Sequence, residues 1–453
     1  MRQSASILRE HPAGLPSEDG TCPARILSKV FETLDRADIP YCVLHGYEDL
    51  PNDIKSDVDC LIDANVSARK LLRLLHERRH EIGADVVHCR GRYIVLAGKR
   101  PDGSHCFLAL DFATDCDLQG ARYFDGREIL ATRRRHGMFW IPAPDLAFAA
   151  YLLRTISKRG LNDQRARRLS NFYRQDPEGA VDQLARFCTP ENSPIIATAA
   201  QSGDWEAARA QLPSLNTGMR SRAIRRRPIR FAANKLSAWA DRVTRIFRPD
   251  GISVAFLGPD GAGKSSVISA LPSELALVFA RHDCWGFAPG ILNTFRRSER
   301  ATDQPHALKS RSLPVSLLRL GYWFAYHTYS YLSIRLALAR STLLLHDRSF
   351  VDILVDQKRY RYGGPLWMLR LVWRLAPKPD LVVLLDAAPE VLQRRKQEVP
   401  YEVTARQREA YLALVGAMPN GRVIDAGAPM AQVVESVTEQ ILEHLRKRLS
   451  RRF

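Results

Sequence analysis

Apolar residues in the first third of the chain alternate between helical spacing and the short runs that are typical of strands. This order predicts an α/β domain over residues 23–143, preceded by a flexible N-terminus over residues 1–22. In chain order, the predicted elements are a helix at 24–37, a strand at 41–44, a strand that carries Asp57, Asp59 and Leu61, a helix at 66–80, and strands at 92–97 and 106–112.

Helical spacing continues without strand-like runs over residues 144–215. Asp176-Pro177 and Thr189-Pro190 interrupt this spacing, as expected at boundaries between helices. We therefore predict a small helical region here. A basic linker and helix over residues 216–250 separates this region from the rest of the chain.

From residue 251 onward, apolar runs alternate with helical spacing, which is typical of a parallel sheet with crossover helices. Nearly every position in the runs is apolar, as expected for strands buried on both faces. The apolar region 313–345 contains three arginines and a histidine, so we interpret it as a buried helix and strand and not as a membrane span. The sequence thus predicts an α/β domain over 251–453, with strands at 252–257, 341–346, 381–385 and 422–424.

The strongest motif is Gly258-Pro-Asp-Gly-Ala-Gly-Lys-Ser265, which matches the phosphate-loop pattern GxxxxGK[ST] at every position. Its glycines allow backbone N–H groups to turn toward phosphate oxygens at the N-terminus of a helix. Lys264 is expected to reach the β- and γ-phosphates of ATP, and Ser265 to ligate Mg²⁺. A P-loop NTPase fold with ATP and Mg²⁺ as cofactors follows. The predicted nucleotide-binding residues are Gly258, Gly261, Ala262, Gly263, Lys264, Ser265 and Ser266.

A second motif narrows the class of P-loop protein. The sequence has no Asn/Thr-Lys-x-Asp guanine motif, whereas the apolar run that starts at Leu343 ends in Asp347 and Arg348. At the carboxyl end of a strand beside the P-loop, Asp347 can hold Mg²⁺ or its water, and Arg348 can grip a phosphate of the acceptor. The alternative for Asp347 is a helix N-cap. Together the two motifs indicate phosphoryl transfer.

At these residues the sequence resembles the thymidylate kinases over nearly all of residues 251–453. That family has a similar P-loop, a similar Asp-Arg pair and a strand similar to 379–386. The resemblance implies that Asp260 faces the acceptor sugar. It also implies an arginine from the lid at the transferring phosphoryl group, because the P-loop has none; Arg394 and Arg395 are the candidates, with surface helix charges as the alternative. A homodimer is implied as well, although no interface can be read from the residues.

Other segments depart from the thymidylate kinase pattern. The Arg-Glu-Pro-Gly type of segment that helps to hold thymidylate is not visible; Trp285-Gly-Phe-Ala-Pro289 and the arginine-rich stretch 296–311 stand in its place. The segment 356–365 is basic and aromatic, which favours an anionic acceptor larger than a nucleotide, or else an ordered surface loop. Kinases of this general appearance also occur in glycan and capsule assembly. The acceptor is therefore expected to be a nucleoside monophosphate or another phosphorylated or sugar-bearing molecule.

The N-terminal domain carries a second set of candidate residues. Asp57 and Asp59 are spaced i, i+2 on one predicted strand, and Asp111 lies on a later one, so the three carboxylates can form a two-metal site. With His45-Gly46 upstream, this arrangement resembles the polymerase-β type of nucleotidyltransferase and implies metal binding by these acids. Tyr47 occupies the position of the family's triphosphate-binding serine. The alternative is a set of surface acids beside a turn.

Charge and cysteine usage bear on partners and location. The net charge is +18, and ten basic residues against one acid fall within 220–248. This stretch is either a solvated linker and helix or a surface that contacts an anionic membrane or another polyanion. The eight cysteines show no CxxC or zinc-finger spacing, and the N-terminus has no apolar signal-like segment. We therefore expect a cytoplasmic protein without a disulfide framework, in peripheral contact with the inner face of the membrane if the basic stretch binds lipid.

Three functions compete at this point. The first is an ATP-dependent kinase with a fused nucleotidyltransferase-like domain. The second is nucleotidyl transfer by Asp57, Asp59 and Asp111 in the modification of glycans or lipid-linked sugars, supported by the P-loop domain. The third is a non-enzymatic scaffold that binds ATP.

Overall fold

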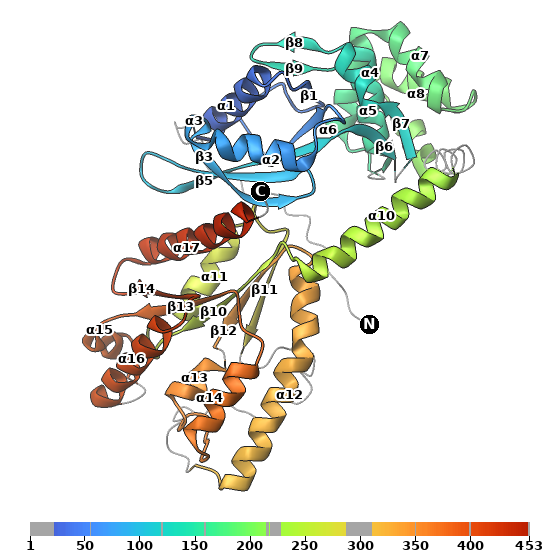
Figure 1. The fold of residues 1–453 in the computed structure, drawn as a ribbon. Helices are drawn as coiled ribbons and strands as arrows, with labels where there is room; N and C mark the ends of the chain where they lie inside the picture. The colour runs from blue at the N-terminus through green and yellow to red at the C-terminus, as the bar shows by residue number, and fades with distance from the viewer. Residues whose placement is uncertain are drawn as a thin grey trace.

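The fold was analysed in a computed structural model, shown in Figure 1. It describes residues 22–54, 56–118, 121–157, 160–213, 217, 228–286, 310–348, 350–397 and 400–451. The predicted flexible N-terminus, most of the basic stretch before residue 228 and most of the segment 285–311 lie outside these described residues.

The N-terminal region forms a five-stranded mixed sheet in the order β1-β2-β5-β4-β3, with β2 and β5 parallel. Helix α1 packs on the sheet through Ile26, Leu27 and Phe31, which recur at helical spacing and are fully buried. The elements are α1 (Cys22–Arg36), β1 (Tyr41–Val43), β2 (Val58–Ile62), α2 (Ala68–Glu77), α3 (Arg79–Ile82), β3 (Ala84–Arg90), β4 (Tyr93–Lys99), β5 (His105–Ala113), β6 (Asp115–Leu118), β7 (Ala121–Asp125), α4 (Gly126–Ala131), β8 (Arg134–His136) and β9 (Phe139–Ile141).

The following region is helical, as the sequence indicates. The two Pro-containing steps mark boundaries: α6 ends at Gln175 and α7 begins at Pro177, and residues 188–191 separate α7 from α8. Further along, α10 runs from this region down to the C-terminal domain (Figure 1). The elements are α5 (Pro144–Ser157), α6 (Asp163–Gln175), α7 (Pro177–Phe187), α8 (Asn192–Ser202) and α10 (Pro228–Phe247).

The C-terminal domain is built on a parallel sheet in the order β11-β12-β10-β13-β14. Alternate residues face opposite layers: Phe256 packs in the core with α11 and α17, whereas Leu257 packs with α13 and α16. The elements are β10 (Ile252–Leu257), α11 (Lys264–Glu274), β11 (Arg281–Gly286), α12 (Leu313–Leu338), β12 (Thr342–Asp347), α13 (Val351–Val355), α14 (Leu366–Leu375), β13 (Leu381–Asp386), α15 (Pro389–Arg395), α16 (Tyr401–Gly416), β14 (Gly421–Asp425) and α17 (Met430–Ser450).

The two domains share a hydrophobic core. Val87 and Val95 of the N-terminal sheet are fully buried in one cluster with Val437 and Ile441 of α17. Around this cluster, Lys99 pairs with Glu439 at 2.9 Å. Helix α17 therefore packs on a face of the N-terminal sheet as well as on the sheet of its own domain, and Figure 1 shows it between the two.

Three expectations from the sequence need correction. Strands β3 and β11 and the hairpins β6-β7 and β8-β9 were not predicted, because these segments lack a clear apolar or alternating pattern. Cys22 and Cys106 form a disulfide between α1 and β5 with an S–S distance of 2.07 Å, although the spacing of the cysteines gave no sign of it. The third correction concerns α12, which is not buried.

Helix α12 extends beyond the edge of the sheet (Figure 1), and within the described part of the chain its main contacts are with α10, α14, β10 and β12. Leu318 is 78% exposed and Tyr329 is 65% exposed. Hydropathy indicated burial, but it does not report whether a neighbouring element is present. Among the described helices, none is long and apolar enough to span a bilayer.

The shared core predicts that both domains unfold together. Ile441→Ala removes a fully buried side chain at this cluster and is expected to lower the free energy of unfolding by about 2–5 kcal/mol. Calorimetry should show one transition that shifts as a whole. The control Val181→Ala, at an exposed site on α7, should stay within about 0.5 kcal/mol. Two separate transitions, with only one displaced, would contradict a shared core.

Candidate active site

The P-loop connects β10 to α11 and requires glycine at several positions. Gly258, Gly261 and Gly263 have positive φ angles of 142°, 86° and 84°. A Cβ atom at Gly258 would lie 2.6 Å from the carbonyl oxygen of Leu385. These glycines therefore fit a loop whose backbone curls around phosphates at the N-terminus of α11, as the motif predicts.

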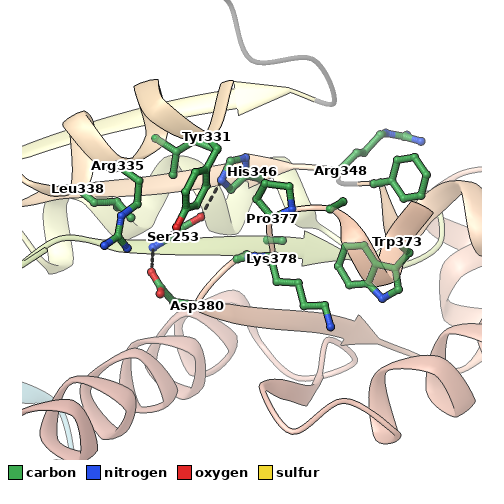
Figure 2. A pocket seen from close by; sticks show the side chains of 15 residues that line it. Ser253, Tyr331, Arg335, Leu338, His346, Arg348, Trp373, Pro377, Lys378 and Asp380 are labelled. Atoms are coloured by element: carbon green, nitrogen blue, oxygen red, sulfur yellow. Dashed lines mark hydrogen bonds between the residues drawn. The ribbon is translucent and has the colours of Figure 1, made fainter. Parts of the chain in front are cut away.

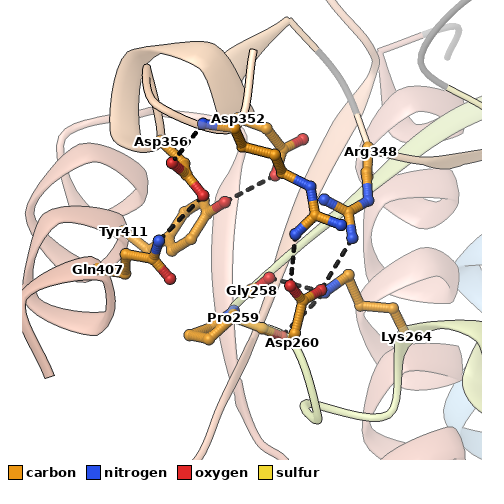
Figure 3. A network of polar contacts seen from close by, with 10 residues as sticks. Gly258, Pro259, Asp260, Lys264, Arg348, Asp352, Asp356, Gln407 and Tyr411 are labelled. Atoms are coloured by element: carbon orange, nitrogen blue, oxygen red, sulfur yellow. Dashed lines mark hydrogen bonds and ion pairs between the residues drawn. The ribbon is translucent and has the colours of Figure 1, made fainter. Parts of the chain in front are cut away.

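Lys264, at the start of α11, is buried and folded back onto the loop. Its Nζ donates to the carbonyl oxygens of Gly258 at 2.7 Å and Pro259 at 2.9 Å (Figure 3). Burial lowers the pKa of the ammonium, Arg348 lowers it further, and Asp260 opposes the shift. Ser265 and Ser266 follow Lys264 on the exposed side of the helix. When a nucleotide binds to the loop, its phosphate oxygens can replace these two carbonyl oxygens as acceptors for the lysine ammonium.

An acid within the loop pairs with two arginines. Asp260 accepts a hydrogen bond from Arg348 at 2.8 Å and forms a second ion pair with Arg359. All three side chains are at most one quarter exposed. Figure 3 shows Asp260 and Arg348 directed toward one another beside Lys264. Two predicted site residues, Asp260 and Arg348, therefore lie together, and Arg359 joins them although it was not predicted.

Arg348 is placed by an unusual backbone conformation. It follows the last residue of β12 with φ of 76°, in the left-handed region that residues with a side chain seldom occupy. Burial alone would lower the pKa of its guanidinium, but the charges of Asp260 and Asp352 together with Tyr360 raise it, so Arg348 remains a cation. A strained residue that carries a fixed charge at the edge of a sheet is typical of functional positions.

Asp347 ends β12 opposite Phe256 of β10, so it lies at the same sheet edge as the P-loop. Its side chain is half-buried. This is the location in which an acid can hold Mg²⁺ or its water, as the sequence analysis proposes for Asp347 together with Ser265. The N-cap alternative is not observed, because α13 starts later, at Val351, with Phe350 as its cap residue.

Behind these residues, buried acids fix the segment 351–362. Asp352 accepts a hydrogen bond from the Tyr411 hydroxyl at 2.8 Å, and Asp356 accepts one from Gln407 at 3.0 Å. Both contacts tie this segment to α16 (Figure 3). Sequence reasoning identified the basic and aromatic segment but missed Arg359 as the partner of Asp260, since no spacing rule links the two.

The candidate lid arginines are placed differently from one another. Arg395 donates to the carbonyl oxygen of Ala426 at 2.8 Å and lines a cavity of about 430 Å³ with Ala262 and Met430. Arg394 is exposed and bonds only weakly, at 3.4 Å, to the carbonyl of Glu390 in its own helix. The described ion pairs of Asp260 are with Arg348 and Arg359. Arg395 instead borders the space next to the P-loop where a nucleotide base can lie.

A second cavity, of about 280 Å³, lies between the sheet, α12 and the segment after α14. Figure 2 shows Ser253 and His346 in hydrogen-bond contact, at 2.8 Å, with Tyr331 of α12 above them. Lys378 and Arg348 lie at the edges of this cavity. The cavity is thus lined by both polar and apolar side chains, and its charged residues are Arg335, Arg348, Lys378 and Asp380.

The three N-terminal acids also converge. Asp59 and Asp111 are register partners on parallel strands, and Asp57, Asp59 and Asp111 place carboxylate oxygens within 4.8 Å of one another. Asp59 also forms an ion pair with Arg154 and lies 3.4 Å from His45 Nε2. Such a set of oxygen ligands suits a divalent cation.

The surroundings of this acid cluster include a buried tyrosine in place of the expected serine, a small cavity and a second tyrosine. Tyr47 is buried and packs against Phe172, so it does not present a hydroxyl in the manner of a phosphate-binding serine. A cavity of about 180 Å³ lies next to the cluster and is lined by His45 and Arg154. Tyr93, on the neighbouring strand, has its pKa raised to about 12 by burial and by the charges of Asp57 and Asp111.

Comparison with characterised proteins finds several similar chains. They are thymidylate kinases. One from Leuconostoc mesenteroides subsp. mesenteroides is 26% identical over 218 residues, covering 43% of this chain and 98% of that protein. One from Xanthomonas oryzae pv. oryzae is 28% identical over 222 residues, covering 46% of this chain and 90% of that protein. No protein-family model matches the chain. The similarity supports a kinase-like region on a P-loop fold.

The lowered pKa of Lys264 predicts a pH dependence of ATP binding. The ammonium attracts phosphates only while it is protonated, so affinity for ATP should fall as the pH rises, and at a lower pH than an ordinary lysine would cause. Lys264→Arg should flatten this decline, because arginine stays protonated. Calorimetric titration with ATP at several alkaline pH values measures this decline in affinity. The control is Lys358→Arg, at a position where the lysine is exposed. The same decline in Lys264→Arg would rule out this lysine as its cause.

Proposed function

We propose that residues 251–453 transfer the γ-phosphoryl group of ATP to an acceptor that carries a phosphate. The observation that supports this function best is the pairing of Asp260, in the P-loop, with Arg348 and Arg359. Two half-buried guanidinium groups beside a phosphate loop suit a second anion next to the γ-phosphate. Phosphoryl transfer needs this kind of positioning and charge neutralisation more than covalent chemistry.

Each residue has a proposed role. Lys264 and the backbone of Gly258, Gly261, Ala262 and Gly263 hold the β- and γ-phosphates, and Ser266 adds a hydroxyl beside them. Ser265 and Asp347 hold Mg²⁺, which neutralises charge on the phosphates when it is bound. Arg348 and Arg359 bind the acceptor phosphate, and Asp260 orients the acceptor and keeps both arginines in place.

A lid arginine at the transferring phosphoryl group remains part of the proposal. Arg394 is the better candidate for movement, because its side chain is exposed and bonded only within its own helix. Arg395 fits a position at the nucleotide base, next to the cavity that it lines.

The acceptor is proposed to be a nucleoside monophosphate or a larger phosphorylated or sugar-bearing molecule. Arg348 belongs both to the ion pairs with Asp260 and to the rim of the 280 Å³ cavity beside α12. An acceptor with a phosphate and a bulky apolar or sugar portion would use both features. Thymidylate, the substrate named for the similar proteins, is one candidate.

Further proposals concern partners and location. The exposed basic residues of α10, among them Lys235 and Arg242, favour contact with a polyanion. A homodimer and a cytoplasmic location, peripheral to the membrane, also stay predictions. Light scattering after size-exclusion chromatography reports the oligomeric state.

A second candidate function is nucleotidyl transfer by the N-terminal domain. The convergence of Asp57, Asp59 and Asp111 favours it, because two metal ions held by such acids activate a hydroxyl for attack on an α-phosphate. A nucleotidyltransferase fold for residues 23–143 is proposed on this basis. The scaffold alternative requires ATP binding without transfer.

The kinase proposal is tested with ATP labelled on the γ-phosphate and a panel of nucleotides, sugar phosphates and glycolipids. Lys264→Ala should lower transfer by about 10²–10³-fold, because a charge at the transferring group is lost. Arg359→Gln should lower kcat/KM for the acceptor by about 10–100-fold while ATP affinity stays unchanged. Ser269→Ala, exposed on α11, is the control. Transfer that survives loss of Lys264 would disprove the proposal.

The nucleotidyltransferase proposal is tested with ATP labelled on the α-phosphate and with Mn²⁺ binding measured by electron paramagnetic resonance. Asp57→Asn and Asp111→Asn should both abolish Mn²⁺ binding in this domain and transfer of α label. Asp182→Asn, at an exposed position on α7, should change neither. Absence of any Mn²⁺ effect would contradict the metal site. If ATP binds but neither label moves, the scaffold alternative is favoured.

A further inference from the structure

The helical region contains a cavity of about 280 Å³ that none of the candidate catalytic or metal-binding residues lines. Helix α6 forms one wall (Figure 1), and the end of α8 together with the helical segment that starts at Glu206 forms the other. Small-molecule sites in proteins usually occupy about 300–1,000 Å³, so this cavity suits a small ligand. Its charged side chains are those of Asp163, Arg167, Arg174, Asp204 and Arg209.

A buried contact joins the two walls of this cavity. Trp205 is 3% exposed, and its indole Nε1 donates at 3.0 Å to the hydroxyl of Ser170, which is 2% exposed. Ala166, which also lines the cavity, is buried in the same hydrophobic cluster as Trp205. The shape of the cavity is therefore fixed by the core of the helical region and does not depend on a bound ligand.

Both acids of the cavity already have defined contacts. Asp163 forms an ion pair with Arg209 at the N-terminal end of α6. Asp204 accepts a hydrogen bond at 3.0 Å from the backbone N–H of Glu206 and so caps the helical segment that follows. One arginine and both acids are thus accounted for, and two arginines remain.

The two remaining arginines, Arg167 and Arg174, lie on one face of α6. They are seven residues apart, which is two helical turns, and both are exposed. Among the residues that the structure describes, neither of them forms an ion pair, and Arg174 donates only a long hydrogen bond, of 3.5 Å, to Asn171 Oδ1. Asn171 lies between the two arginines along the helix, and its NH2 group adds a neutral donor to their two charges.

We propose that this cavity binds a small molecule that carries a phosphate or diphosphate group. Guanidinium groups pair with phosphate oxygens through parallel N–H···O bonds, and dianionic phosphate matches the two positive charges of Arg167 and Arg174. The rise between their positions on α6 is about 10 Å, which two arginine side chains can span from opposite ends. This site goes beyond the proposed kinase reaction: its ligand is an effector and not a reactant, since no residue assigned to phosphoryl transfer lines the cavity.

Other anions fit the cavity less well. Asp163, Asp204 and Glu206 are exposed beside it and would repel a nucleic-acid backbone that continued past the arginines, whereas a compact anion ends within the cavity. A carboxylate carries less charge and fewer acceptor oxygens than a phosphate, so it would gain less from two guanidinium groups.

The test is calorimetric titration of the full-length Lys264→Ala protein with pyrophosphate in a buffer that contains EDTA. Loss of Lys264 weakens the P-loop as a competing phosphate site, and EDTA removes the metal ions through which the acid cluster could hold phosphate. Binding is expected, and it should weaken as the salt concentration rises. Arg167→Gln with Arg174→Gln in the same background should lower the affinity by about 100-fold, because two charged donors that contribute roughly tenfold each are lost.

Further variants and ligands separate a binding site from a general effect of charge. Asn171→Asp places a carboxylate between the arginines and should lower the affinity for pyrophosphate by about tenfold. Arg73→Gln with Arg90→Gln removes two exposed arginines from the N-terminal domain and should leave the affinity intact. Glucose 1-phosphate should bind through the same two arginines, and succinate should bind about tenfold more weakly than pyrophosphate. Unchanged melting curves show that each variant is folded.

Two results would overturn the proposal. One is equal affinity for pyrophosphate with and without Arg167→Gln and Arg174→Gln. The other is no pyrophosphate binding by the Lys264→Ala protein; if the two substitutions then lower affinity for a single-stranded oligonucleotide, the arginines belong to a nucleic-acid surface. Failure of γ-phosphoryl transfer, with pyrophosphate binding that still depends on these arginines, would contradict the kinase proposal and leave this one standing.

Discussion

The burial of α17 between two sheets is the contact on which the arrangement of the whole chain depends. Val437, Ile441 and Leu445 are completely removed from solvent, in a cluster that includes Val87 and Val95 from the other domain. Apolar burial of this kind contributes far more than the ion pairs at its edge, such as Lys99 with Glu439. The P-loop domain and the acid cluster of the N-terminal domain are therefore parts of one packed body.

Within that body, the candidate kinase site is organised around charge. Asp260 lies beside Arg348, Arg359 and Lys264, so the cluster keeps a net positive charge before any phosphate binds. Buried carboxylates behind it, Asp352 and Asp356, hold the segment that carries Arg359. In a site built this way the cations are held in position before a phosphate arrives and need little rearrangement.

The sequence predicted those parts of the site that depend on local order. The P-loop needs its glycines at fixed spacing, and Asp347 and Arg348 follow directly from the end of a buried strand. The convergence of Asp57, Asp59 and Asp111 was also foreseen, because strand periodicity and the register of β2 with β5 place them on one face. Four of the five strands of the parallel sheet, β10, β12, β13 and β14, were predicted to within about two residues for the same reason, whereas β11 was not predicted.

Features that depend on distant partners were not predictable in this way. Arg359 pairs with Asp260 across 99 positions of sequence, and Cys22 with Cys106 across 84. The exposure of α12 is decided by which elements fail to cover it, and a hydropathy pattern contains no such information. Only the fold specifies these relations.

The position of α17 also has a consequence for protein synthesis. Val95 lies far upstream of the helix that covers it, so the ribosome must add roughly 340 residues before that cover exists, which takes about 17–70 s at ordinary elongation rates. During that interval an apolar face of the N-terminal sheet is open to chaperones and to other nascent chains. The cellular yield of this protein thus depends on how that interval is managed.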